Sequence, residues 1–165
     1  MAQVLALTMI ALARVALGGT AAFAQSAMPC LAEVQNAAGQ LQQTDAALRA
    51  ALAPELGKIG ALAQEAIAVS AHATVLAASA TAIVTTFGAG APPVADNAAL
   101  GRQDTVQRWR AEWDSIHAKA AATFATLAAR ATSGAARKAA RDARATYDAA
   151  RNRVASCVAA SVSGA

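Results

Sequence analysis

The chain has 165 residues, with 14 basic and 10 acidic side chains and a formal net charge of +4. About a third of the residues are alanine, the strongest helix former, and only 4% are aromatic. This composition predicts one all-α domain of ordinary size and argues against sheet-based folds.

The N-terminus has the pattern of a secretory signal. An apolar run, VLALTMIALA, is followed by AFA at 22–24, a small-x-small cleavage site. We therefore expect a signal peptide over 1–24 and a mature chain over 25–165, periplasmic or extracellular after cleavage near Ala24. Because no Lys or Arg precedes the apolar run and Arg14 interrupts it, a misplaced start codon or an uncleaved amphipathic helix are alternatives.

Cys30 and Cys157 are the two cysteines of the chain and lie near the two ends of the predicted mature part. In an oxidising compartment such a pair predicts one disulfide, with two buried free thiols as the alternative. On the chain-entropy description, closing this loop stabilises the fold by about 4 to 5 kcal/mol.

The stretch AIAVSAHATVLAASATAIVTTF, residues 66–87, contains no Asp, Glu, Lys or Arg. From Ile59 onwards, positions at helical spacing form an apolar seam that runs through this stretch: Ile59, Leu62, Ala66, Val69, Ala73, Leu76, Ala80, Ile83 and Phe87. A lipid-exposed span has no reason to keep polar groups off one seam, so the pattern predicts a bundle helix and no transmembrane helix in the mature chain. We expect Ser70, His72 and the other polar residues on a wetted flank.

Pro54 marks a turn or strong kink, because proline disfavours helical geometry in the residue before it. The segment 88–103, containing GAGAPP, predicts a linker, and Asp104 is a candidate cap for the helix after it. Thr132 to Gly134 end that helix, with Gly134 in a left-handed cap. Breaks at both Pro54 and Gly134 predict an antiparallel four-helix bundle, and a long kinked two-helix hairpin is the alternative.

Candidate chemistry is sparse. His72 and His117 flank opposite sides of their seams, so we predict partly exposed histidines and no metal site. Neither histidine is placed to activate a serine, and no Cys-x-x-Cys-His occurs, so we expect no cofactor and no enzyme. Trp109 and Trp113 fall on the seam of their helix, which predicts a core position.

Charge is distributed unevenly along the chain: residues 25–100 carry 2 basic and 5 acidic groups, and residues 101–165 carry 11 basic and 5 acidic groups. Arg137, Arg141, Arg144 and Arg151 share one helical face. This basic face predicts a non-catalytic protein that acts by binding or assembly, its partner a protein or an anionic envelope surface.

Two other functions are compatible with the sequence, a lipid-binding amphipathic protein whose helices open on a membrane and a helical surface-coat protein. We do not expect nucleic acid as the partner. Alanine-rich seams can self-associate, so the pattern also allows a homo-oligomer.

Overall fold

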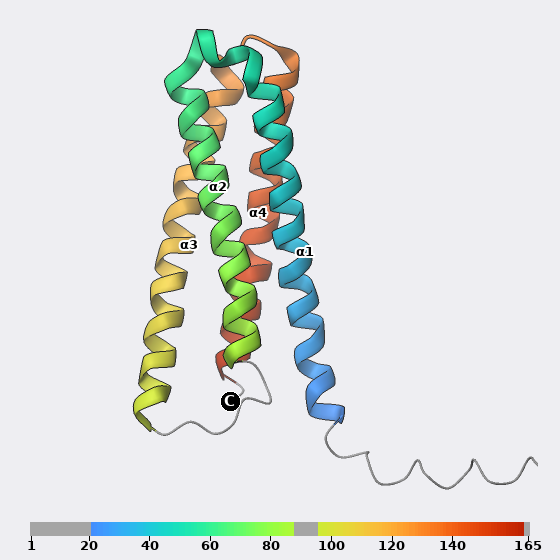
Figure 1. The fold of residues 1–165 in the computed structure, drawn as a ribbon, viewed down its shortest axis with the longest axis vertical. Helices are drawn as coiled ribbons and strands as arrows, with labels where there is room; N and C mark the ends of the chain where they lie inside the picture. The colour runs from blue at the N-terminus through green and yellow to red at the C-terminus, as the bar shows by residue number, and fades with distance from the viewer. Residues whose placement is uncertain (1–20, 88–95, 164–165) are drawn as a thin grey trace, which may run out of the picture.

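The protein is all-helical in the part that the computed structural model describes, the backbone of 21–87 and 96–163 with the side chains of 30–87 and 101–161. Helix fills three uninterrupted stretches there, 21–87, 96–130 and 134–163, and no strand is present. The elements are α1 (Ala21–Leu52), the 3-10 turn η1 (Ala53–Glu55), α2 (Leu56–Phe87), α3 (Asp96–Arg130) and α4 (Gly134–Ser163). They pack against one another (Figure 1), which confirms the all-α prediction.

The predicted signal peptide, 1–24, lies outside the described residues up to position 20, and 21–24 belong to α1. Its cleavage near Ala24 therefore stays a prediction.

The chain turns back on itself between α1 and α2, which then pack along each other (Figure 1). Pro54 lies in η1, where its missing amide hydrogen removes a donor from the helical ladder. Ile59, with φ −130° and ψ 36°, is the non-helical residue within α2. The change of direction predicted at Pro54 is therefore spread over 53–59.

The predicted linker, 88–103, is too long. The structure has α3 begin at Asp96, so 96–103 are helical and Asp104 lies inside the helix, where it cannot be the cap. After Pro93 no residue bars a helix, since Ala98, Ala99 and Leu100 favour it and Gly101 disfavours it by only about 1 kcal/mol. Residues 88–95 lie outside the described part.

The turn between α3 and α4 also differs from expectation. Gly134 is the first residue of α4 and makes no left-handed cap. Ser133 caps this helix instead, because its hydroxyl oxygen accepts a hydrogen bond from the amide of Ala136 at 3.1 Å. A serine before an alanine-rich run can cap the following helix as readily as a glycine can end the preceding one.

The predicted seam of α2 faces the protein interior. Ala66, Val69, Ala73, Leu76, Ala80 and Ile83 are buried, while Ile59, Leu62 and Phe87 at the ends are half-buried. By length and composition alone, the stretch Cys30–Phe87 holds an apolar window that could cross a membrane, but 44% of that window is buried inside the protein. Core helices of soluble proteins can also contain an apolar window of this length.

Bulky side chains of α3 fill the space between its neighbours. Trp109, Trp113, Phe124 and Leu127 are buried, as predicted for the tryptophans. The Trp109 indole donates to the Leu76 carbonyl of α2 at 3.0 Å, and Trp113 donates to the Arg151 carbonyl of α4 at 3.3 Å. Both indole N–H groups thus have the partner that burial demands.

A buried carboxylate joins the two turns at one end of the molecule. Glu55 of η1 is 1% exposed, and its oxygens accept hydrogen bonds from the amides of Thr132 at 3.0 Å and Ser133 at 2.7 Å. The Thr132 hydroxyl donates at 2.9 Å. The Thr132 amide hydrogen bond is the main cause that lowers the pKa of Glu55 to about 2, against the opposing effect of desolvation.

Cys30 of α1 and Cys157 of α4 pair at the other end, with their Cα atoms 5.4 Å apart. The pair predicted from the sequence is confirmed. The bridge spans 127 positions of sequence and links α1 to the last helix.

Glu55→Gln should lower the melting temperature at pH 7 by several degrees, because an amide nitrogen would face the Thr132 and Ser133 donors. The folded-state pKa is depressed, so the stabilisation by Glu55 is present above pH 4.5 and is lost as pH falls towards 2. The difference in melting temperature between the variant and the parent should therefore shrink as the pH falls from 4.5 towards 2. Glu65→Gln, at an exposed carboxylate, is the control, and an equal effect there would contradict the assignment.

Replacing both cysteines by serine should reduce the free energy of unfolding by about 2 to 5 kcal/mol. Urea unfolding followed by circular dichroism, with the parent in oxidised and reduced form, measures the change. Equal midpoints for the two forms of the parent would show that the bridge does not stabilise this fold.

Candidate functional site

The predicted basic face lies on the solvent side of α4. Arg137, Arg141, Arg144 and Arg151 are all exposed. Steps of four, three and seven residues keep them on one flank of the helix, because a helix turns once every 3.6 residues. The opposite side of α4 is buried against the other helices through Ala136, Ala140, Ala143, Tyr147, Ala150 and Val154.

Carboxylates neutralise only one end of this face. Arg151 lies 3.2 Å from Asp114 of α3, and Arg144 lies 3.7 Å from Asp148. Within the described part of the chain, Arg137 and Arg141 form no ion pair. Because all four guanidinium groups are exposed, the two pairs contribute little to stability.

The neighbouring stretch of α3 offers Arg137 and Arg141 no negative charge. Contacts of Trp113 with Arg151 and of Phe124 with Tyr147 set which residues of α3 and α4 lie level. By this register, Arg137 to Arg144 lie beside the later half of α3. Residues 115–130 contain no Asp or Glu. Uncompensated positive charge therefore collects at the Arg137 end.

Polar side chains from different elements occupy the middle of the molecule: Asp45 of α1, Ser70 of α2, His117 of α3 and Tyr147 of α4. Together they are called the central polar cluster. Ser70, His117 and Tyr147 are 0%, 3% and 1% exposed. The expectation that Ser70 lies on a wetted flank is wrong, because α4 covers that flank of α2.

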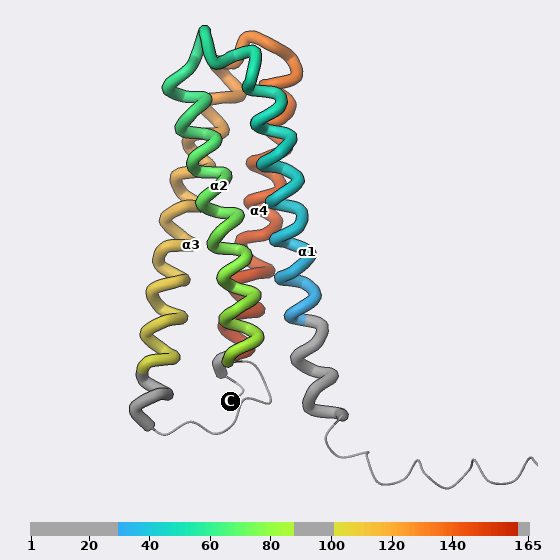
Figure 2. The backbone as a smooth tube through the Cα atoms, in the orientation of Figure 1, coloured from blue at the N-terminus to red at the C-terminus, as the bar shows by residue number. Residues whose placement is uncertain are grey.

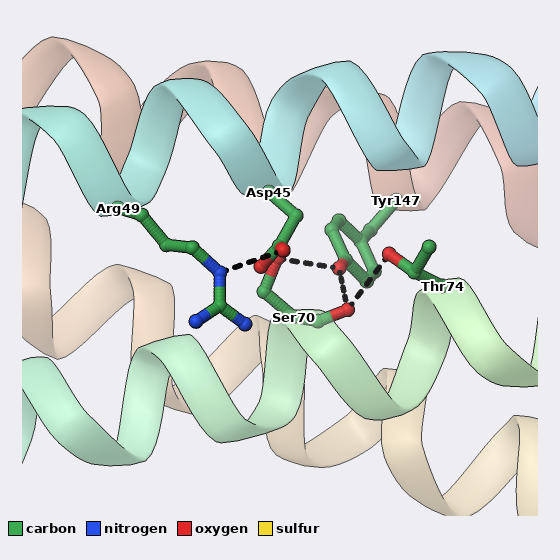
Figure 3. Close-up of polar contacts among 5 residues, drawn as sticks. All are labelled: Asp45, Arg49, Ser70, Thr74 and Tyr147. Carbon is green, nitrogen blue, oxygen red and sulfur yellow. Dashed lines mark hydrogen bonds and ion pairs between the residues drawn. The ribbon is translucent and has the colours of Figure 1, made fainter.

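Within the central polar cluster, hydrogen bonds join Ser70 and Tyr147, and Asp45 bonds to Arg49 beside them (Figure 3). The Tyr147 hydroxyl donates to the Ser70 carbonyl oxygen at 3.0 Å and lies 3.1 Å from Ser70 Oγ. Thr74 donates to the same carbonyl, and Arg49 donates to Asp45 at 2.8 Å. Burial raises the pKa of Tyr147 to about 12, so its hydroxyl keeps its proton at neutral pH.

His117 is the second correction in the core, since a partly exposed side chain was predicted. Its ring packs edge-on against Trp113 at 4.8 Å and faces Tyr147 at 5.8 Å. Burial, reinforced by nearby Arg151, lowers the pKa of His117 to about 4. In the sequence, the one indication that His117 could be buried was its position directly after the seam residue Ile116. Its burial results from the α3–α4 contact, which extends beyond the seam and covers His117 as well.

His72 is exposed, as predicted, and its Nε2 lies 2.8 Å from Glu112 Oε1. The two histidines thus face different neighbours, α3 for His72 and α4 for His117. No group of three or more His, Cys, Asp or Glu side chains converges anywhere in the described residues.

The central polar cluster contains groups used in catalysis but no activated pair. The Ser70 hydroxyl lies against Tyr147, and no hydrogen bond between Ser70 and His117 is present among the described side chains. His117 Nε2 and Asp45 Oδ1 are both buried with no hydrogen-bond partner in the protein. A serine nucleophile needs a base within hydrogen-bond reach, which this arrangement does not supply.

Comparisons with family models, with curated proteins and with solved structures found no match for this chain. Its function is therefore inferred from its own residues and geometry.

His117 predicts acid sensitivity. Its folded-state pKa is depressed from 6.5 to about 4, so stability is complete above pH 6.5 and falls as pH drops towards 4. The decrease in the free energy of unfolding should approach about 2 kcal/mol, allowing for solvent screening. The His117→Gln variant should show little of this decrease. Urea unfolding between pH 7 and pH 4 measures the change. Phe124→Leu, which weakens the same packing without a titrating group, should keep the parent's pH dependence.

Proposed function

We propose that the protein is an exported, non-catalytic helical protein that binds an anionic surface of the cell envelope through the basic face of α4. The single observation that carries the proposal is the exposed row of four arginines in which Arg137 and Arg141 have no ion pair in the described structure. Rows of uncompensated cations attract anionic surfaces and accelerate their encounter.

The proposal includes an antiparallel four-helix bundle as the rigid support for this face. The packing of α1 along α2, and of α4 against both α1 and α3, supports a closed bundle over the long kinked hairpin. In the hairpin alternative the chain would not turn back at η1. Much of the α2 seam would then be uncovered. The Cys30–Cys157 pair supports the same arrangement, since it holds the first and last helices together at one end.

The proposal assigns the apolar stretch of α2 to the bundle core and not to a membrane span. The burial of Val69, Leu76 and Ile83 supports that choice. Export rests on the sequence pattern of 1–24. The proposal assigns no catalytic step, because the hydroxyls of Ser70 and Tyr147 are buried in the core and lie against each other.

Charge reversal on the basic face tests the proposal with dextran sulfate as the anionic probe. Arg137→Glu combined with Arg141→Glu should bind at least about tenfold more weakly at low salt, and the parent's affinity should fall as salt is raised. Isothermal titration or retention on the immobilised polymer measures both effects.

Arg108→Glu combined with Lys119→Glu is the matched control, because it makes the same change of charge at exposed positions of α3. These positions share a helical face with Glu112, which points to α2 and away from the basic face. Equal weakening by the two double variants would show that net charge, and not this face, determines binding.

The lipid-opening alternative remains a separate prediction. A bundle that opens on lipid should change its near-ultraviolet circular dichroism with anionic vesicles as Trp109 and Trp113 leave the core, whereas a closed bundle should keep that signal.

A further inference from the structure

Two of the described turns, η1 and the turn between α3 and α4, meet at one end of the molecule (Figure 2). We call this the turn end and define it as residues 53–58 together with 130–138. Cys30 and Cys157 lie towards the other ends of α1 and α4. Glu55 accepts hydrogen bonds from Thr132 and Ser133, and Lys58 Nζ donates to the Thr132 hydroxyl at 3.1 Å. These contacts hold the two turns together, so their exposed side chains belong to one surface.

A leucine is exposed on this surface. Leu56 is 42% exposed, and its neighbours Ala53, Pro54 and Gly57 are exposed as well. Among the described residues the other exposed large hydrophobic side chain is Val75, which lies midway along α2 and is 64% exposed. The turn end therefore presents an apolar tip, while Val75 lies alone on the side of the molecule.

Positive charge accompanies the apolar tip. Lys58, Arg130, Arg137 and Lys138 of the turn end are all exposed. Its one carboxylate, Glu55, is buried and occupied by the amides of the opposite turn. Asp142, one helical turn beyond, pairs with Lys138. The solvent-facing charge of the turn end is therefore positive.

We propose that the turn end docks end-on against a bilayer that contains anionic lipid, with Leu56 entering the headgroup boundary and the cations contacting lipid phosphates. An apolar tip among cations suits a lipid interface, because lipid can take up an apolar side chain and attract positive charge at once. A soluble polyanion would use the charge and gain nothing from Leu56. The inference rests on the anionic partner proposed above and specifies its class and the orientation of binding.

A tryptophan placed at the tip would report this orientation. Leu56→Trp should show blue-shifted emission with vesicles containing phosphatidylglycerol, and brominated lipid should quench it. Trp109 and Trp113 are 6% and 0% exposed and contribute a constant background. Val75→Trp is the matched control, at the other exposed hydrophobic position, and its emission should not change.

Quenching of Val75→Trp instead of Leu56→Trp would overturn end-on docking in favour of binding along the side of the molecule. Equal binding to pure phosphatidylcholine vesicles would overturn the role of the cations. Absence of binding to either vesicle, together with retained binding to dextran sulfate, would overturn the lipid assignment while leaving the proposed function intact. Loss of both interactions would reject the two proposals together.

Affinity measured by vesicle sedimentation separates the turn end from the remainder of the basic face. Lys58→Glu combined with Arg130→Glu should weaken binding to the anionic vesicles by roughly 25-fold or more, at about fivefold for each basic residue near the surface. Leu56→Ser should weaken it by roughly three- to tenfold. Arg141→Glu combined with Arg144→Glu should have the smaller effect of the two charge reversals, and the reverse order would contradict docking by the turn end.

Discussion

Packing of bulky side chains, most of them from α1 and α3, against helix faces rich in alanine is the constraint on which the structure depends. Trp109, Trp113, Phe124 and Leu127 come from α3, whereas α2 and α4 contribute many buried alanines beside larger residues such as Leu76 and Tyr147. Alanine permits close approach of helices but fills little volume, so an all-alanine interface would leave the core poorly packed. The large groups of α3, together with Leu41 and Leu48 of α1, supply that volume and bury the charge-poor seam of α2.

Polar groups inside the molecule then select one register of the helices. Tyr147 reaches a carbonyl on α2, and Glu55 reaches two amides in the turn before α4. Sliding a helix by one turn would leave these groups buried without partners, which is costly in a low-dielectric interior. Alanine-rich seams discriminate weakly between registers because their residues are alike, so such contacts matter more here than in a core of varied large side chains.

The positions of the carboxylates determine where positive charge stays exposed on the surface. Glu55 is occupied inside, while α3 beside Arg137 and Arg141 has no carboxylate. Positive charge is therefore concentrated towards the end where the two turns meet. The side of α4 and the turn end are two parts of one cationic surface that share Arg137, and they differ in that only the turn end adds an exposed leucine.

The sequence by itself determined the helical class, the buried seam of α2 and the core tryptophans, because alanine content and apolar spacing act through local geometry. The exposure of the four arginines on α4 followed from the same periodicity. The sequence also indicated the cysteine pair, because the chain contains two cysteines. Only the tertiary structure decided the burial of Ser70 and His117, the capping of α4 by Ser133 and the occupation of Glu55 by the opposite turn. Each of these depends on which helix covers a flank or which turn meets another, and residues far apart in the chain carry no local signal of that contact.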